Sequence, residues 1–533
     1  MKIIHYHLLL LVSIMLPFPF LQAASKSTQE NFLHCLREKS NISNHPISAA
    51  IFTPTNSSFS SVLRSYAQNL RFASLGAAKP VAVIAAMHES HVQAAVSCAR
   101  AHGLLIKTRS GGHDYEGLSY QSNVPFVLLD LFNLRSIDID LKDESLWVQS
   151  GAVLGEIYYN IAAKSKNHGF PAGVCPTIGA GGHFAAGGYG NMVRKYGLSV
   201  DNIVDARLVD VEGRILDRKS MGEDLFWAIR GGGASFGIVL SWKLKLVAVP
   251  NPVTVFRVDR TIEEGATELV YQWQNVAAKL PKDLFIRLEA RVINGSGVAK
   301  KTVKVSFVAM FLGQAGKLVE LMKERFPALG LKRADCKEMP WIESTLFWDN
   351  VPEGTSTRVL LDRKHHKKDF VKIKSDYVLE PISKSGLESI WKKMIELEKI
   401  RLMQWNPYGG RMSEISVSET PFPHRDALFK IQYVVFWNEE SLNASKKYVK
   451  VARKFHGFMA PYVSKNPRRA FFPYRDIDVG SSPSCNATYE EAKGGYGWKY
   501  FESNFDSLVL VKTKYDRTNF FRNEQSIPPL RLM

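Results

Sequence analysis

The first half of the chain alternates short apolar runs with amphipathic stretches. Apolar runs at residues 80–86 and 104–108 enclose a segment, 89–102, whose apolar positions recur with the helical period. Short apolar runs bounded by turn residues are typical of buried strands, so this pattern predicts a strand, a helix and a second strand. The same criteria predict strands at 126–130, 146–150 and 237–246, a helix at 154–164, and a hairpin formed by 203–210 and 215–217.

The pattern changes after Pro250 and Pro252, which mark a domain boundary. Strands are predicted at 254–258, 284–293, 301–311, 376–378 and 429–436, and helices at 263–280, 316–326, 384–400 and 448–462. We therefore expect an α+β chain of two domains, because 533 residues are too many for one core. The first domain spans 75–250 and is preceded by a cap, 25–74, with helices at 30–39 and 60–69. The second spans 251–466, and in it helices cover one face of an antiparallel sheet.

The composition is that of a globular protein, with 45% hydrophobic and 23% charged residues. A net charge of +18 raises the question of nucleic-acid binding. The lysines and arginines are scattered, however, and the sequence contains no helix-turn-helix, zinc-finger or RRM pattern. A solvated basic face is the better interpretation, and we expect neither a nucleic-acid partner nor a metal site.

The N-terminus has the features of a secretory signal. Lys2 precedes an apolar run at 8–16, and Gln22-Ala23-Ala24 offers a small-residue cleavage site. This run is too short to span a membrane, and no later stretch is long and apolar enough to do so. We expect residues 1–24 to be removed and the mature chain to enter the secretory pathway as a soluble protein.

An oxidising compartment favours a disulfide, and an odd number of cysteines fits one of them serving another purpose. The five cysteines are Cys35, Cys98, Cys175, Cys336 and Cys485. The Asn-X-Ser/Thr pattern also permits glycosylation at five positions. These are Asn41, Asn56, Asn294, Asn443 and Asn486.

Two glycine-rich segments carry the candidate chemistry. Residues 109–117 read RSGGHDYEG, and residues 175–183 read CPTIGAGGH. Each sets a nucleophilic side chain, His113 or Cys175, beside glycines whose backbone N–H groups can approach a flat or phosphorylated ligand without a Cβ in the way. Taken singly, the histidine would be interpreted as a turn residue and the cysteine as a core residue. Together they suggest a cofactor held at two points.

The first of these segments follows a predicted strand. We expect the N–H groups of Ser110, Gly111 and Gly112 to bind a phosphate there, with Arg109 nearby as a countercharge. The segment is not the GxGxxG pattern of a Rossmann fold.

The paired motifs resemble those of the berberine bridge enzyme-like flavoproteins of plants, which have the PCMH-type fold of the vanillyl-alcohol oxidase superfamily. The resemblance implies FAD bonded through its 8α carbon to His113 and through C6 to Cys175. It also implies a Cys35–Cys98 disulfide and a C-terminal segment, 467–533, that returns to the FAD-binding domain. The other residues expected to hold the cofactor are Arg109, Ser110, Gly111, Gly112, Gly179, Gly181 and Gly182.

Oxidation of an alcohol by hydride transfer to a flavin also requires a base for the hydroxyl proton. A tyrosine with its ordinary pKa near ~10 is a poor base, but a nearby ammonium can lower that pKa. By the resemblance, the residue that corresponds to the family's base is Tyr474, in the segment Phe472-Pro473-Tyr474-Arg475-Asp476. The family usually has Asn in place of Pro473.

Lys430 and Gln432 lie two residues apart on a predicted strand and so face one side. In one branch of the family the equivalent lysine activates the tyrosine and the glutamine binds substrate. Tyr189 matches a further active-site tyrosine. Without the resemblance, Lys430 would read as a surface lysine and Tyr474 as a core aromatic residue.

The position three residues after the flavin cysteine controls access of oxygen in the resembling proteins. Valine there goes with oxidase activity, and bulkier residues block the flavin. Here the residue is Ile178, one methylene larger, which favours a dehydrogenase or a slow oxidase with oxygen or a quinone-like acceptor.

The first interpretation is a secreted, monomeric FAD-linked oxidoreductase of the cell wall, apoplast or vacuole. It oxidises a small-molecule alcohol, either a hydroxycinnamyl alcohol or a sugar at its anomeric carbon. The alternatives are an oxidative cyclase acting on an alkaloid or prenylated phenol, and a cyclase without net redox change. A third possibility, from another class, is a wall-binding glycoprotein in which FAD is only structural.

Overall fold

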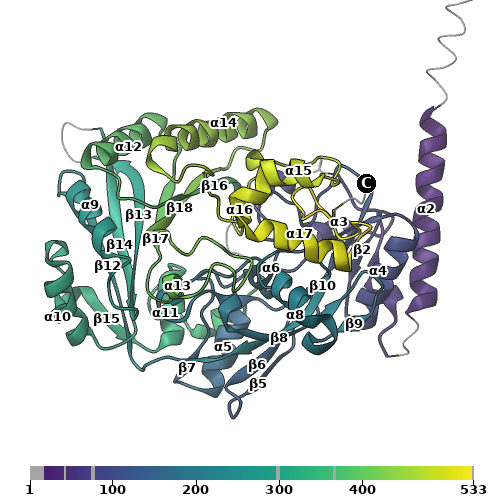
Figure 1. Cartoon of the computed structure of the whole chain (residues 1–533), viewed down its shortest axis with the longest axis horizontal. Helices are drawn as coiled ribbons and strands as arrows, with labels where there is room; N and C mark the ends of the chain where they lie inside the picture. Colours follow the sequence, from purple (N-terminus) through teal and green to yellow (C-terminus); the bar gives the residue numbers. More distant parts are fainter. Residues whose placement is uncertain (1–16, 41–43, 74–77, 296–299, 364–367, 531–533) are drawn as a thin grey trace, which may run out of the picture.

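The computed structural model describes residues 17–40, 44–73, 78–295, 300–363 and 368–530, with side chains from residue 27 onwards. The apolar run of the expected signal and the sequon at Asn41 lie outside these ranges. The first described element is the helix α2, Pro17–Lys39, at the edge of the molecule (Figure 1). It is joined to α4, Glu89–Ala101, by the Cys35–Cys98 disulfide, which confirms the expected pairing.

The first sheet has four short strands in the order β1-β2-β4-β3. Their bounds are β1 Ile51–Phe52, β2 Val83–Ala85, β3 Leu105–Arg109 and β4 Phe126–Asp130. β2, β4 and β3 are parallel, and β4 is buried along its whole length, as its continuous apolar run predicts. α3, Phe59–Arg64, is shorter than the helix predicted at 60–69. At the end of the predicted range, Asn69 has an extended backbone, and its side-chain amide donates to the carbonyls of Tyr115 and Val371.

The second sheet is antiparallel, with the order β5-β6-β10-β8-β9. Its strands are β5 Ile137–Asp140, β6 Ser145–Gln149, β8 Ile203–Val209, β9 Ile215–Leu216 and β10 Ile238–Lys245. The helices α5, Leu154–Lys164, and α8, Arg218–Ile229, follow in the same part of the chain. β7, His168–Gly169, pairs with β11, Val247–Ala248, to form a separate two-stranded sheet.

The third sheet is the largest, with seven strands that are antiparallel throughout. In sheet order they are β15 Cys336–Met339, β12 Val253–Thr261, β14 Lys301–Phe311, β13 Leu284–Asn294, β17 Leu402–Pro407, β18 Phe429–Trp437 and β16 Phe370–Val378. One face packs against a shared apolar core contributed by helices. These are α9 Ala266–Val276, α10 Ala315–Arg325, α12 Lys384–Leu397 and α14 Leu442–Phe458, on the outer side in Figure 1. The predicted α+β class and the one-sided helical cover are confirmed.

The C-terminal segment lies beside the first half of the chain (yellow in Figure 1). Its main elements are α15 Tyr489–Ala492, α16 Trp498–Phe501 and α17 Asn504–Tyr515. Tyr515 Oη donates to the carbonyl of Met221 in α8 at 2.9 Å. The buried Lys512 ammonium donates to Ser235 O at 2.6 Å, and it also bonds Asp516 and Phe521 O. α17 is therefore attached to the glycine-rich turn that follows α8.

Candidate cofactor and active site

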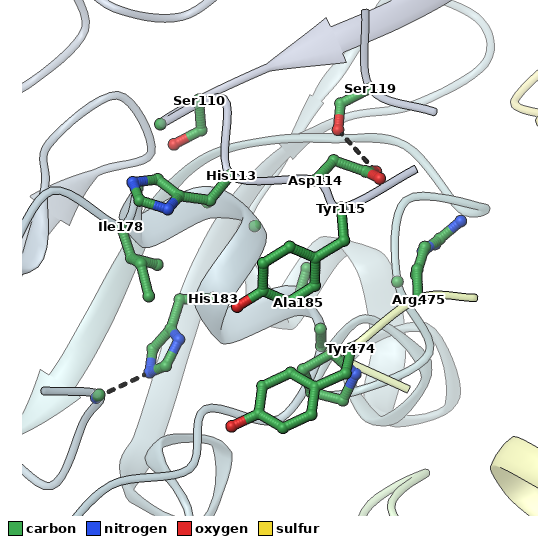
Figure 2. Close-up of a pocket in the computed structure, with 18 of the residues that line it drawn as sticks. Ser110, His113, Asp114, Tyr115, Ser119, Ile178, His183, Ala185, Tyr474 and Arg475 are labelled. Atoms are coloured by element: carbon green, nitrogen blue, oxygen red, sulfur yellow. Dashed lines mark hydrogen bonds between the residues drawn. The ribbon is translucent and has the colours of Figure 1, made fainter. Parts of the chain in front are cut away.

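A cavity of about 530 Å³ lies where these parts meet. Both glycine-rich segments line it, as do residues 471–475 of the C-terminal part and side chains from the face of the seven-stranded sheet opposite the four helices. Figure 2 shows His113, Ile178 and His183 around one part of this space and Tyr115 and Tyr474 around another. Segments that are more than 300 residues apart in the sequence thus share one cavity, as cofactor and substrate sites commonly require.

The two glycine-rich segments are packed backbone to backbone. A Cβ on Gly111 would lie 2.3 Å from the backbone nitrogen of Gly179, and a Cβ on Gly179 would lie 2.2 Å from that of Gly111. Ser110 Oγ donates to Ser150 O at 2.6 Å and fixes the first segment to the second sheet. Because no side chain fits at either position, only glycine allows the two loops to approach this closely.

This packing brings His113 and Cys175 to the same cavity. Thr177 lies between them, with its Oγ1 2.9 Å from His113 Nε2 and 3.6 Å from Cys175 Sγ. Burial raises the pKa of the Cys175 thiol to about 11, and the carboxylate of Asp349 adds to this rise. The free cysteine is therefore a neutral thiol at neutral pH.

The Arg109 side chain does not lie in the cavity, where the sequence interpretation expects it. Its side chain is fully buried, and its guanidinium bonds Asp130 Oδ2 through Nη2 at 2.6 Å and through Nε at 3.2 Å. Nη2 also donates to the carbonyl of Val62 at 2.9 Å. Residues 109 and 130 are partners in the parallel β3–β4 pair, so strand geometry directs the guanidinium to Asp130 and the cap instead of the cavity. The cationic side chains that line the cavity instead include Lys107, Arg475 and Arg522.

The residues that line the cavity fit FAD. Gly111, Gly112, Gly179, Gly181 and Gly182 all line the cavity, beside the short helix α6, Ala180–Ala185. A Cβ on Gly182 would meet no protein atom within 4 Å, so any side chain there would occupy the cavity itself. His183 is half-buried and accepts from Gly173 N through Nε2 at 3.0 Å. Burial lowers its pKa to about 3, with Lys430 adding to the effect, so the ring is neutral and Nδ1 carries its proton.

Lys430 lies beneath three aromatic rings of the cavity wall. Its Nζ is 3.2 Å from the ring centroid of Phe471, 3.8 Å from that of Tyr189 and 4.4 Å from that of Tyr474. Among the described residues it has no hydrogen-bond partner. Burial and then the charge of Arg287 hold the pKa of Lys430 well below its ordinary value, although the ring faces favour the cation.

The expected lowering of the tyrosine pKa by this lysine does not occur. Burial raises the pKa of Tyr474 to about 12, and the charge that opposes the rise is that of Arg287. The physical reason is that burial costs an anionic phenolate and an ammonium alike. Lys430 shares the phenol's dry environment and is itself biased toward the neutral amine, so it lacks a fixed charge with which to stabilise a tyrosinate.

The remaining predicted residues are brought together. Gln432 Nε2 donates to Tyr115 Oη at 3.4 Å, and the rings of Tyr115 and Tyr474 meet edge to face at 5.9 Å. Tyr189 donates its hydroxyl hydrogen to Pro407 O at 2.6 Å, and Ile178 lines the cavity beside the cysteine segment.

The sequence interpretation missed the polar wall contributed by β13. Arg287, Glu289 and Arg291 all line the cavity. Arg287 Nε donates to Asn406 Oδ1 at 2.7 Å, and its guanidinium lies over the Trp348 ring. The sequence contained a pattern that predicts this wall, because charged residues at every second position of an apolar strand indicate one polar face.

Two absences hold for the described part of the chain. No helix in it has the length and apolar character needed to cross a membrane. No cluster of three or more His, Cys, Asp or Glu side chains in it is arranged to hold a metal ion.

The fold and the paired glycine segments define an FAD-binding protein. A profile described as FAD binding domain matches residues 80–218, and one described as Berberine and berberine like matches residues 470–528. Berberine bridge enzyme-like 8 of Arabidopsis thaliana is 54% identical over 98% of this chain and 99% of its own.

Solved structures agree. Berberine bridge enzyme from Eschscholzia californica is 37% identical with a TM-score of 0.87, covering 94% of this chain and 100% of that one. Wild-type Phl p 4.0202, described as a glucose dehydrogenase, is 43% identical with a TM-score of 0.88 and the same coverage. A Phl p 4 variant with valine in place of one isoleucine is described as a glucose oxidase. The chain belongs to the berberine bridge enzyme-like family of FAD-dependent oxidoreductases, which confirms the resemblance.

The open space beside Gly182 can be tested by filling it. Replacing Gly182 with Leu places an isobutyl group in the cavity while raising the helix propensity of α6. We expect the variant to fold with less than about one tenth of the wild-type flavin, measured as absorbance per protein, because the side chain and the cofactor compete for one volume. Gly457→Leu is the matched control, since Gly457 is an exposed helical glycine of α14 with open space around its Cβ position. Full flavin content in Gly182→Leu would show that the cofactor does not lie against α6.

Proposed function

We propose that this chain is a secreted FAD-linked alcohol dehydrogenase whose cofactor is bonded to both His113 and Cys175. Its substrate is a hydroxycinnamyl alcohol or a sugar oxidised at the anomeric carbon. The observation that supports this most directly is the shared cavity, which contains both attachment residues together with Gln432 and Tyr474. FAD bound there supplies the two-electron acceptor for the hydride.

Tyr474 is the proposed proton acceptor for the substrate hydroxyl, at its Oη. Its approach to the tyrosinate form depends on Arg287, the charge that opposes the effect of burial on its pKa. Each pKa unit gained in this way is worth ~1.4 kcal/mol. Gln432, held by Tyr115, offers its amide to the substrate oxygen, and the aromatic rings around Lys430 exclude water from the site.

The wall opposite the tyrosines favours a hydroxylated substrate. Glu289 is buried, accepts from Gln404 Nε2 at 3.3 Å and lies within 3.5 Å of Arg257 and Arg291. A buried carboxylate held among donors can accept hydrogen bonds from substrate hydroxyl groups, and Trp348 adds an apolar surface beside it. The similarity to Phl p 4, described as a glucose dehydrogenase, adds weight to the sugar.

Secretion and glycosylation belong to the same proposal. The four sequons in the described ranges, Asn56, Asn294, Asn443 and Asn486, are all exposed. The Cys35–Cys98 disulfide is of the kind that persists in an oxidising compartment. We propose a glycosylated monomer that passes its electrons to oxygen or to a quinone-like acceptor.

Acid precipitation and anaerobic titration test this function. The purified protein should be yellow and should keep its colour in the acid pellet. Cys175→Ala should retain one linkage and His113→Ala/Cys175→Ala neither, so the double variant should release its flavin to the supernatant. Coniferyl alcohol or cellobiose should bleach the wild-type flavin anaerobically. Bleaching by a benzylisoquinoline alone would favour the cyclase alternative, and wild-type colour released by acid would overturn the double linkage.

Ile178 is predicted to restrict oxygen. Ile178→Val removes one methylene from the cavity wall, and valine in place of one isoleucine accompanies the change from dehydrogenase to oxidase in the descriptions of Phl p 4. We expect the rate constant for reoxidation of the reduced flavin by oxygen to rise at least about tenfold, a barrier change of ~1.4 kcal/mol. Anaerobic reduction by substrate should stay within about twofold. Fast peroxide formation by the wild type, or no gain in the variant, would contradict this role.

The pH dependence should follow the tyrosinate. Because the pKa of Tyr474 is raised to about 12, its anionic fraction grows about tenfold per pH unit across the stable range. The limiting rate of anaerobic flavin reduction should therefore rise with a slope near one between about pH 6 and 9, without a plateau. Arg287→Gln should lower the rate throughout this range, Arg287→Lys should lower it as well because burial favours the neutral amine, and Tyr474→Phe should abolish the slope. A plateau near neutral pH in the wild type would show that Tyr474 is already ionised there.

A further inference from the structure

A cluster of buried charges lies behind the active-site tyrosines. Lys372 and Lys374 are on β16, the edge strand of the seven-stranded sheet. Lys372 Nζ donates to Glu116 and to Asp476 Oδ1, the latter at 2.6 Å. Lys374 Nζ donates to Asp476 Oδ2 at 2.5 Å and to Asp478 Oδ2 at 2.9 Å. The cluster is closed by Arg453 on Asp478 and by Arg71, whose Nη1 lies 3.5 Å from Glu116 Oε2.

The partners of Lys372 are neighbours of the active-site tyrosines. Glu116 directly follows Tyr115 in the histidine segment, and Asp476 lies two residues after Tyr474. The strand that carries Lys372 pairs with β18, where Ser375 is opposite Gln432. One ammonium therefore connects the segment of Tyr115, the segment of Tyr474 and the sheet that presents Gln432.

We propose that Lys372 is a positioning residue that fixes Tyr115 and Tyr474 relative to each other and to the substrate-binding strand. It contacts neither ring and acts through Glu116 and Asp476. The assignment of these tyrosines to the active site rests on the proposed function, whereas the mechanical link between the two segments does not.

Burial makes this link strong. The Lys372 side chain is 1% exposed, and the Glu116 side chain is 0% exposed. An ionised carboxylate in such surroundings must be paired, because water cannot replace a lost partner. Without Lys372, the described residues would leave Glu116 with the more distant Arg71 and Asp476 with Lys374. Both segments would then have to move toward other partners or toward water.

Lys374 provides a matched control within the same strand. It bonds Asp476 and Asp478, and within the described ranges it forms no ion pair with Glu116. Lys374→Met should therefore loosen the tyrosine segment at 470–478 and leave the histidine segment at 113–121 unchanged. Lys372→Met should loosen both segments, which is the distinguishing feature of the proposed link.

Hydrogen–deuterium exchange of the flavin-loaded full-length protein measures this difference between the two lysine variants directly. We expect exchange in peptides covering 113–121 and 470–478 to accelerate at least about tenfold in Lys372→Met, and only the second peptide to accelerate in Lys374→Met. Lys372→Arg should restore wild-type exchange in both. If Lys372→Met does not fold, Glu116→Gln/Lys372→Met removes the unpaired carboxylate and is compared with Glu116→Gln alone. Unchanged exchange in 113–121 on loss of Lys372 would overturn the link.

Kinetics then separate this proposal from the proposed function. With the alcohol that bleaches the wild-type flavin, Lys372→Met should lower the limiting reduction rate about ten- to a hundredfold, with KM within about threefold, because the proton acceptor is misplaced while the substrate wall is intact. A rise in KM alone would overturn the positioning role. If neither alcohol is oxidised by the wild type, the proposed function fails, and the exchange result still decides whether Lys372 joins the two segments.

Discussion

The contact between Gly111 and Gly179 is the constraint on which the site depends. Their backbones approach so closely that a Cβ on either glycine would overlap the backbone of the other segment. This contact attaches the end of β3 to the start of α6 and so unites a parallel sheet with an antiparallel one. His113 follows Gly111 by two residues, Cys175 precedes Gly179 by four, and Thr177 Oγ1 lies near both side chains. The proposed two-point attachment of FAD would need two loops held in fixed register, and a glycine pair can hold them without side chains that would occupy cofactor volume.

Burial is the largest influence on the protonation states of the titratable side chains around the cavity. It raises the pKa values of Tyr474 and Cys175 and lowers those of His183 and Lys430, so each of these groups is biased toward its neutral form. Charges that remain must be compensated, as the ions around Lys372 are. A reaction that generates a phenolate in this cavity therefore needs a cation that cannot lose its proton. Arg287 meets this need better than the lysine that the sequence pattern favours, because a guanidinium stays charged where an amine does not.

The sequence predicted most of the fold because apolar periodicity reports burial directly. β4, α5 and β14 have the predicted bounds, and the others differ mainly at their ends. Two predictions that differ from the structure, for β16 and for Arg109, differ for the same reason. β16 was predicted only at 376–378, because Lys372 and Lys374 interrupt its apolar run, although both are buried. Their counterions lie about a hundred or more residues away in the chain, so nothing near them in the sequence shows that they are neutralised. Arg109 was misplaced for the same reason, since its partner Asp130 is on another strand.

Buried polar groups with distant partners also join the first half of the chain to the seven-stranded sheet. Arg194 is buried and donates to five carbonyls on or near strands of that sheet, among them Tyr408 O at 3.0 Å, Ala278 O at 3.1 Å and Leu280 O at 2.5 Å. Directional bonds from a planar guanidinium fix orientation more tightly than apolar contact, which tolerates sliding. The adjoining bond from Tyr189 Oη to Pro407 O extends this control to the cavity wall. Because Coulomb energy falls with distance, a shift of the sheet relative to the flavin loops would weaken the influence of Arg287 on Tyr474. The polar junction therefore contributes to the proposed chemistry, since it keeps Arg287 and Tyr474 at a constant separation.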